Sequence, residues 1–139
     1  MKTIPLKKSL EATKKANSRL LEAIDTLKNE SSKDKSKKEV LFDAVVKRFE
    51  VLFEYTWKML KVASEYEGIE APGPRPAIQE AVRFGWITDP EFWAEALDAR
   101  NGSVHDYFGI SEDKYLKVIT RFNKEIESII PRLEKIISK

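Results

Sequence analysis

The sequence contains no cysteine and a single histidine, His105, which excludes several kinds of site at the outset. Without thiols the chain forms no disulfide, has no cysteine nucleophile and offers no cysteine ligand to a metal. No apolar run approaches the roughly 20 residues of a membrane-spanning helix, and the N-terminal residues lack the apolar core of a signal peptide. We therefore expect a cytoplasmic protein that does not enter a membrane.

The sequence also lacks four further features: a convincing strand, an internal repeat, a glycine-rich phosphate loop and a carboxylate cluster that could bind a metal. We therefore predict neither a metal nor a cofactor. The chain has 139 residues, enough to bury a core, and we predict one domain over residues 1–139.

The positive charge is concentrated at the start of the chain. Residues 1–38 carry eleven Lys and Arg against five Asp and Glu, whereas the remainder carries fourteen against eighteen. Two interpretations stay open: these lysines bind phosphates, or they only keep an exposed helix and its loop in solution.

Apolar residues recur at spacings of three and four along most of the chain, which predicts amphipathic helices. We expect helices at about residues 5–28, 37–67, 76–84 and 90–101, and a last helix capped by Ser111. Loops are expected at residues 29–38 and 69–76. The end of the second helix is predicted at Gly68, and Gly102 is predicted to break or distort the fourth. The fold class predicted is all-α, an up-and-down four-helix bundle with an additional short helix.

Two features inside the predicted helices leave alternatives open. Asn17 lies within the apolar stripe of the first helix and is either a buried hydrogen-bonded group or part of a partner interface. The helix at 37–67 is apolar and aromatic around much of its circumference, so it is either central in the bundle or covered by a second subunit. Its charged residues are interpreted as surface or interface groups rather than as catalysts, and Glu54 and Lys58 among them as a favourable pair four residues apart.

One short segment gathers several groups capable of chemistry: Arg100, Asn101, His105 and Tyr107. Histidine titrates near neutral pH and suits proton transfer, and arginine holds phosphate through paired donors. RNA phosphodiester cleavage needs these two functions and no metal. One histidine per chain is few for full acid–base catalysis. A two-fold dimer would bring two such motifs, and so two histidines, to one cleft. The alternative is structural: Arg100 pairs with Asp98 or a helix end, His105 is an ordinary turn residue, and Tyr107 is a core aromatic.

The segment Arg100-Asn101-x-x-x-His105-x-Tyr107 resembles the R-x4-6-H motif of the HEPN superfamily. The stretch Arg48-Phe49-Glu50-x-x-Phe53-Glu54-x-x-Trp57-Lys58 is similar to the signature of the nucleotidyltransferase substrate-binding family within it. Pro74-Arg75-x-x-Ile78-x-Glu80-Ala81 and Gly85-Trp86-Ile87 also match, and the likeness runs from about residue 40 to the C-terminus.

The resemblance implies a homodimeric HEPN-type toxin, a metal-independent endoribonuclease of a toxin–antitoxin pair, neutralised by a cognate minimal nucleotidyltransferase. By the same match Arg100 and His105 would be catalytic, Asn101 would support them, and the antitoxin would adenylylate Tyr107. A second hypothesis is a non-catalytic subunit that binds substrate for the nucleotidyltransferase. A third is a dimeric helical scaffold with a vestigial motif.

Overall fold

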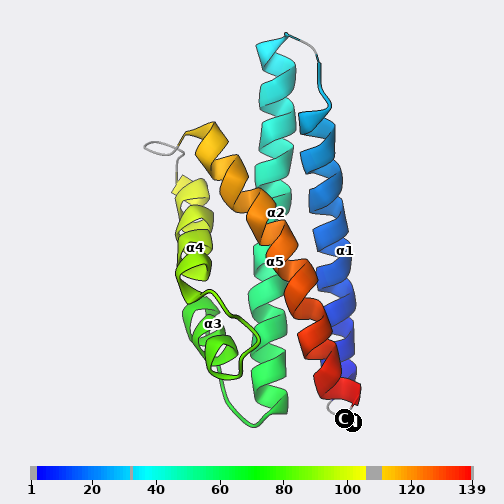
Figure 1. Ribbon diagram of the computed structural model, residues 1–139, viewed down its shortest axis with the longest axis vertical. Coiled ribbons are helices and arrows are strands. Elements are labelled where there is room, and N and C mark those ends of the chain that lie inside the picture. Colours follow the sequence, from blue (N-terminus) through cyan, green and yellow to red (C-terminus); the bar gives the residue numbers. More distant parts are fainter. Residues whose placement is uncertain (1–2, 32, 106–110, 139) are drawn as a thin grey trace.

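The computed structural model describes residues 3–31, 33–105 and 111–138, with the backbone alone for 103–105. These residues form α1 (Thr3–Lys28), α2 (Lys35–Tyr66), α3 (Pro74–Arg83), α4 (Pro90–His105) and α5 (Glu112–Ser138), and no strand occurs among them. Successive long helices run in opposite directions, and the short α3, which follows α2 in the chain, lies below α4 and beside the lower part of α2 (Figure 1). The predicted all-α, up-and-down bundle with one extra short helix is confirmed. Over the same ranges, no helix is both long and apolar enough to span a bilayer.

The second helix is central in the bundle. It lies beside α1, and α5 crosses α1 and α2 obliquely. Helices α3 and α4 lie on the side of α2 opposite to α1 (Figure 1). Phe42, Phe49 and Phe53 of α2 are buried, whereas Tyr55 is exposed. The wide apolar face predicted for this helix is therefore used mainly inside the bundle.

An aromatic cluster joins α2, α4 and α5. The ring of Phe122 stacks on Phe53 at a centroid distance of 5.3 Å, and meets Phe49 edge-on at 5.5 Å and Trp93 edge-on at 5.0 Å. Such ring pairs stabilise a fold beyond the area that they bury. The cluster fixes α4 against the other two helices, and α4 carries the candidate site.

The first helix begins at Thr3, two residues earlier than predicted, and three further differences from the predicted helix boundaries have a local cause. Lys35 and Ser36 belong to α2, because the Asp34 carboxylate accepts a hydrogen bond from the Ser36 N–H and caps the helix earlier than expected. Pro74 begins α3, since a proline in the first turn removes no intrahelical hydrogen bond. The third difference is at Gly102, which lies within α4. By contrast, Gly68 follows the end of α2 with a φ of 88°, as its predicted terminating role requires.

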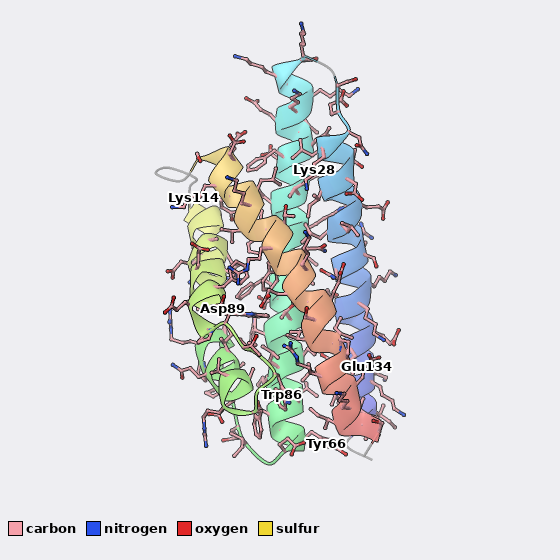
Figure 2. All side chains as sticks on the ribbon, viewed as in Figure 1. Lys28, Tyr66, Trp86, Asp89, Lys114 and Glu134 are labelled. Carbon is pink, nitrogen blue, oxygen red and sulfur yellow. The ribbon has the colours of Figure 1, made fainter. Side chains whose placement is uncertain are left out.

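Helix α5 is tied to α1 by polar contacts as well as by its apolar face. Asn17 is buried, and the side-chain amide of Asn123 donates to its Oδ1 at 2.7 Å and to its carbonyl oxygen at 3.0 Å. This contact decides the question about Asn17 in favour of a buried hydrogen-bonded group. Near the C-terminal end of α5, the Glu134 carboxylate accepts a hydrogen bond from the Lys14 ammonium of α1 at 2.8 Å (Figure 2).

Candidate functional site

The start of α4 is fixed by Asp89. Its carboxylate accepts a hydrogen bond from the Phe92 N–H at 3.1 Å, the capping role that the sequence predicts. Arg121 of α5 pairs with the same carboxylate and lies over the Phe92 ring, 4.1 Å from its centroid. The Phe92 N–H and the Arg121 guanidinium hold the pKa of Asp89 below its usual value. These contacts set where α4 begins and how it is rotated.

Two further hydrogen bonds hold α4 from the core side. The hydroxyl of the buried Tyr115 donates to the Ala99 carbonyl oxygen at 2.8 Å, one residue before Arg100. The indole N–H of Trp93 donates to Glu125 at 2.9 Å, which gives this otherwise buried ring a polar partner. Because both bonds connect α4 to α5, the backbone that carries Arg100 is held against the centre of the bundle.

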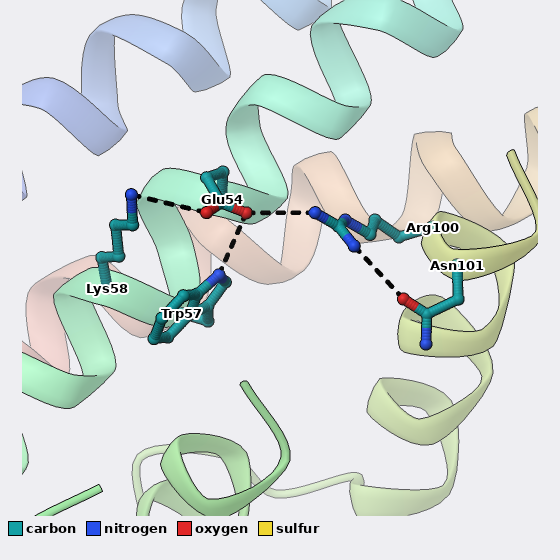
Figure 3. A network of polar contacts seen from close by, with 5 residues as sticks. All are labelled: Glu54, Trp57, Lys58, Arg100 and Asn101. Atoms are coloured by element: carbon teal, nitrogen blue, oxygen red, sulfur yellow. Dashed lines mark hydrogen bonds and ion pairs between the residues drawn. The ribbon is translucent and has the colours of Figure 1, made fainter. Parts of the chain in front are cut away.

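Arg100 reaches across to α2 (Figure 3). Its Nη2 lies 3.2 Å from Oε2 of Glu54, and its Nη1 donates to Oδ1 of Asn101 at 3.3 Å. The Arg100 side chain is 31% exposed, so it is held by protein groups and still accessible from solvent. A guanidinium placed in this way can pair with an incoming phosphate.

Glu54 is itself held by its own helix. The Trp57 indole N–H donates to its Oε2 at 3.1 Å, and the Lys58 ammonium lies 3.4 Å from its Oε1 (Figure 3). Partial burial acts to raise the pKa of Glu54. The hydrogen bond from Trp57 and the positive charges of Lys58 and Arg100 outweigh that effect, so its pKa lies below the usual value. Glu54 is therefore ionised at neutral pH.

The structure brings together two of the four predicted site residues, Arg100 and Asn101. The predicted break at Gly102 is wrong, because the backbone stays helical through His105. Gly102 is not among the glycines with positive φ, and a helical glycine costs only about 1 kcal/mol relative to alanine. Positions 100 and 105 are consequently about 140° apart around the α4 axis. Tyr107 lies outside the described residues.

Sequence reasoning did not include Glu54, Trp57 or Lys58 in the candidate site. The predicted Glu54–Lys58 pair is confirmed, but Glu54 also contacts Arg100, 46 residues away, and is more than a surface charge. A signal was present, since all three residues belong to the signature quoted for the second helix. What was missing was the packing of α2 on α4.

A groove of about 500 Å³ opens between α1 and α2. Lys15 and Arg19 of α1 and Lys47 and Arg48 of α2 line it, together with the half-exposed Tyr55. Within the described part of the chain, none of these four cations forms an ion pair with a carboxylate. The basic first segment thus contributes to a cationic groove that includes α2 residues, and Tyr55 directly follows Glu54 in the sequence.

The chain matches the sequence profile of a known protein family. The profile of the family described as "Nucleotidyltransferase substrate binding protein like" matches residues 8–135. The chain belongs to this family. The match includes α2 with its signature and α4 with Arg100 and Asn101, so both sides of the Glu54–Arg100 contact lie in the family's shared region.

A curated protein of similar sequence, from Haemophilus influenzae, is described as a probable ribonuclease HepT. It is 31% identical over 74 residues, which make up 50% of this chain and 51% of that protein. The chain thus spans about half the length of the curated relative it matches.

Two solved structures share the fold of this family member. A protein from Thermus thermophilus has a TM-score of 0.63 at 27% identity, covering 82% of this chain and 98% of its own. The tri-AMPylated HEPN toxin of Shewanella oneidensis, solved in complex with an MNT antitoxin, has a TM-score of 0.72 at 15% identity, covering 94% and 96%. The likeness to the latter shows the fold alone. The predicted resemblance to the nucleotidyltransferase substrate-binding family is confirmed by the family match.

Proposed function

We propose that this protein is a HEPN-type toxin of a toxin–antitoxin pair and acts as a metal-independent endoribonuclease. The observation that carries the proposal is the Arg100 guanidinium, held by Glu54 and Asn101 and open to solvent, five residues before His105 on α4. The family match, the relative described as a probable ribonuclease and the fold shared with a HEPN toxin support it.

The proposed chemistry uses Arg100 and His105 in different roles. In RNA cleavage the 2′-hydroxyl attacks the adjacent phosphorus, and the 5′-oxygen leaves. His105 would move a proton at one of these oxygens, since imidazole titrates near neutral pH. Arg100 would stabilise the charge that builds on the phosphoryl oxygens, and Asn101 would orient it. Neither role requires a metal.

We propose that the active form is a homodimer. Positions 100 and 105 are about 140° apart around α4, so one helix does not present both residues in one direction. A two-fold dimer supplies two arginines and two histidines to a shared cleft, in which Arg100 of one subunit works with His105 of the other. The site is then incomplete in a monomer. In this proposal residues 1–139 form one domain, and the protein acts in the cytoplasm.

We propose a minimal nucleotidyltransferase as the antitoxin, which neutralises the protein by adenylylating Tyr107. The support is the AMPylated state and the MNT partner of the Shewanella oneidensis structure that shares this fold. With the partner and ATP, the intact mass of the protein should rise by whole AMP units, and the mass of Tyr107→Phe should not change. An unchanged number of AMP units on Tyr107→Phe would exclude this tyrosine.

The test of the proposed function is cleavage of a structured RNA in EDTA by wild type, His105→Ala and Arg100→Ala. Loss of a positioned acid–base group should lower the rate by about 10²–10⁴-fold. A change of less than about tenfold for His105→Ala would contradict its catalytic role. Equal cleavage by all three proteins would identify a contaminating nuclease.

The family description favours a second candidate, a non-catalytic subunit that binds substrate for the nucleotidyltransferase. This candidate predicts a stable complex with the nucleotidyltransferase and no RNA cleavage by the purified dimer. The ribonuclease instead predicts that overexpression slows growth and that His105→Ala relieves the inhibition, and an equally toxic His105→Ala protein would exclude catalysis by this motif.

A further inference from the structure

We infer that Glu54 is a positioning residue for Arg100, so that α2 and α4 form one catalytic unit. This inference rests on the proposed ribonuclease function. Glu54 stands where three donors converge: Trp57 and Lys58 from its own helix, and Arg100 from α4 (Figure 3). A carboxylate that only made a helix more soluble would not need a partner on a second helix.

The contacts fix the plane of the guanidinium as well as its place. Nη1 of Arg100 faces Asn101 and Nη2 faces Glu54, so the two terminal nitrogens are held by separate acceptors. An arginine fixed at both nitrogens loses little further freedom when it binds phosphate, and it needs no reorganisation in the transition state. Without Glu54, the contact of Nη2 with α2 would be lost, and the bond of 3.3 Å from Nη1 to Asn101 would remain within α4.

Trp57 and Lys58 make Glu54 a stiff support. They lie three and four residues after it and approach different oxygens of the carboxylate, at 3.1 and 3.4 Å. Lys58 also matters for charge. A lone carboxylate beside Arg100 would neutralise it, whereas one carboxylate with two cations leaves a net positive charge facing a phosphate. The arrangement thus orients Arg100 without cancelling its charge.

The experiment compares RNA cleavage by wild type, Glu54→Ala and Glu54→Gln. The control is Glu65→Gln, which removes a matched carboxylate: Glu65 is on the same helix, pairs with Lys61 four residues away and is 42% exposed, against 39% for Glu54. Glu54→Ala should lower kcat by about 10- to 100-fold with little change in KM, because a misplaced catalytic group costs up to about 10²-fold. Glu54→Gln should be intermediate, and Glu65→Gln should stay within about twofold of wild type.

Two results would overturn the inference. One is a kcat for folded Glu54→Ala within about twofold of wild type. The other appears in the background of Arg100→Ala, where Glu54→Ala should cause no further loss if it acts through Arg100. A full additional loss there would show that Glu54 acts independently of the arginine.

A second readout separates this inference from the proposed function. In 15N-edited NMR spectra, the Nε–H group of Arg100 should be rigid in wild type and in Glu65→Gln, and mobile in Glu54→Gln. That result would support the positioning role even if the wild type cleaves no RNA. An equally rigid Arg100 in Glu54→Gln would refute it, whatever the activity.

Discussion

Replacing Asn123 by leucine should destabilise the protein more than replacing Asn17, although the two amides contact each other. Asn123 donates both hydrogen bonds of the pair, at 2.7 Å to the Asn17 side chain and at 3.0 Å to its backbone carbonyl. Asn123→Leu removes both and leaves the buried Asn17 Oδ1 without this donor, a cost of about 1–3 kcal/mol. Asn17→Leu removes only the first, since the carbonyl of residue 17 still accepts from Asn123. We expect it to cost about 1 kcal/mol less.

The double variant Asn17→Leu/Asn123→Leu should be more stable than the sum of the single effects predicts. Removing both polar side chains leaves no amide oxygen unsatisfied, and an apolar pair of similar shape is close to neutral. Urea unfolding followed by circular dichroism measures the three differences, and thermal unfolding should agree at about 2–4 °C per kcal/mol for a chain near 150 residues. A larger loss for Asn17→Leu than for Asn123→Leu, or strictly additive effects, would refute the reasoning.

Three other predictions follow from the contacts around α4 and the groove. Because the pKa of Asp89 is lowered in the folded state, its contribution to stability is present above its unfolded pKa of about 3.9 and is lost as pH falls through the folded value. Unfolding free energy measured between about pH 4 and pH 2 should therefore fall more steeply for wild type than for Asp89→Asn, and equal slopes would contradict this. Tyr115→Phe removes the hydrogen bond to the Ala99 carbonyl and should cost about 0.5–1.5 kcal/mol in chemical denaturation, with unaltered stability as the adverse result. Under the proposed function, Lys15→Glu/Lys47→Glu should weaken binding of a labelled single-stranded RNA at least about tenfold and reduce the dependence of log K on log salt by about 1–2 units. Unchanged RNA affinity with loss of the nucleotidyltransferase complex would instead assign the groove to the protein partner.

Helix positions and buried faces were predictable because both depend on local sequence. The stripe containing Leu6, Leu10 and Leu20 is buried in α1 as its spacing predicts. Caps at Asp89 and Ser111 were predictable for the same reason, since the capping bond reaches only three residues along the chain. The errors at Pro74 and Gly102 share one cause. Both residue types are unfavourable in helix interiors on average, but first-turn placement removes the penalty for one, and packing of α4 offsets it for the other.

The contact between Glu54 and Arg100 could not be predicted from the spacing of either motif. Each motif is local, but their meeting depends on the rotation and axial position of α4 against α2, which are set by side chains far from both. Sequence similarity shows that the two segments occur in one family, and it does not say that they touch. Only the packing of α2 against α4 brings the Glu54–Lys58 pair into contact with Arg100, the candidate catalytic arginine.

The position of Arg100 therefore depends on the core. The Tyr115 hydroxyl donates to the carbonyl oxygen of Ala99, the residue before Arg100. Trp93 packs on Phe122, and Asp89 caps the start of α4. A change of one residue in the register of α4 would turn Arg100 by about 100° and carry it away from Glu54. Core substitutions at Trp93 or Tyr115 should consequently lower activity before they unfold the protein, because the ion pair tolerates less displacement than the apolar contacts do. In this bundle, the residues that stabilise the fold and those that orient the site act through the same helix.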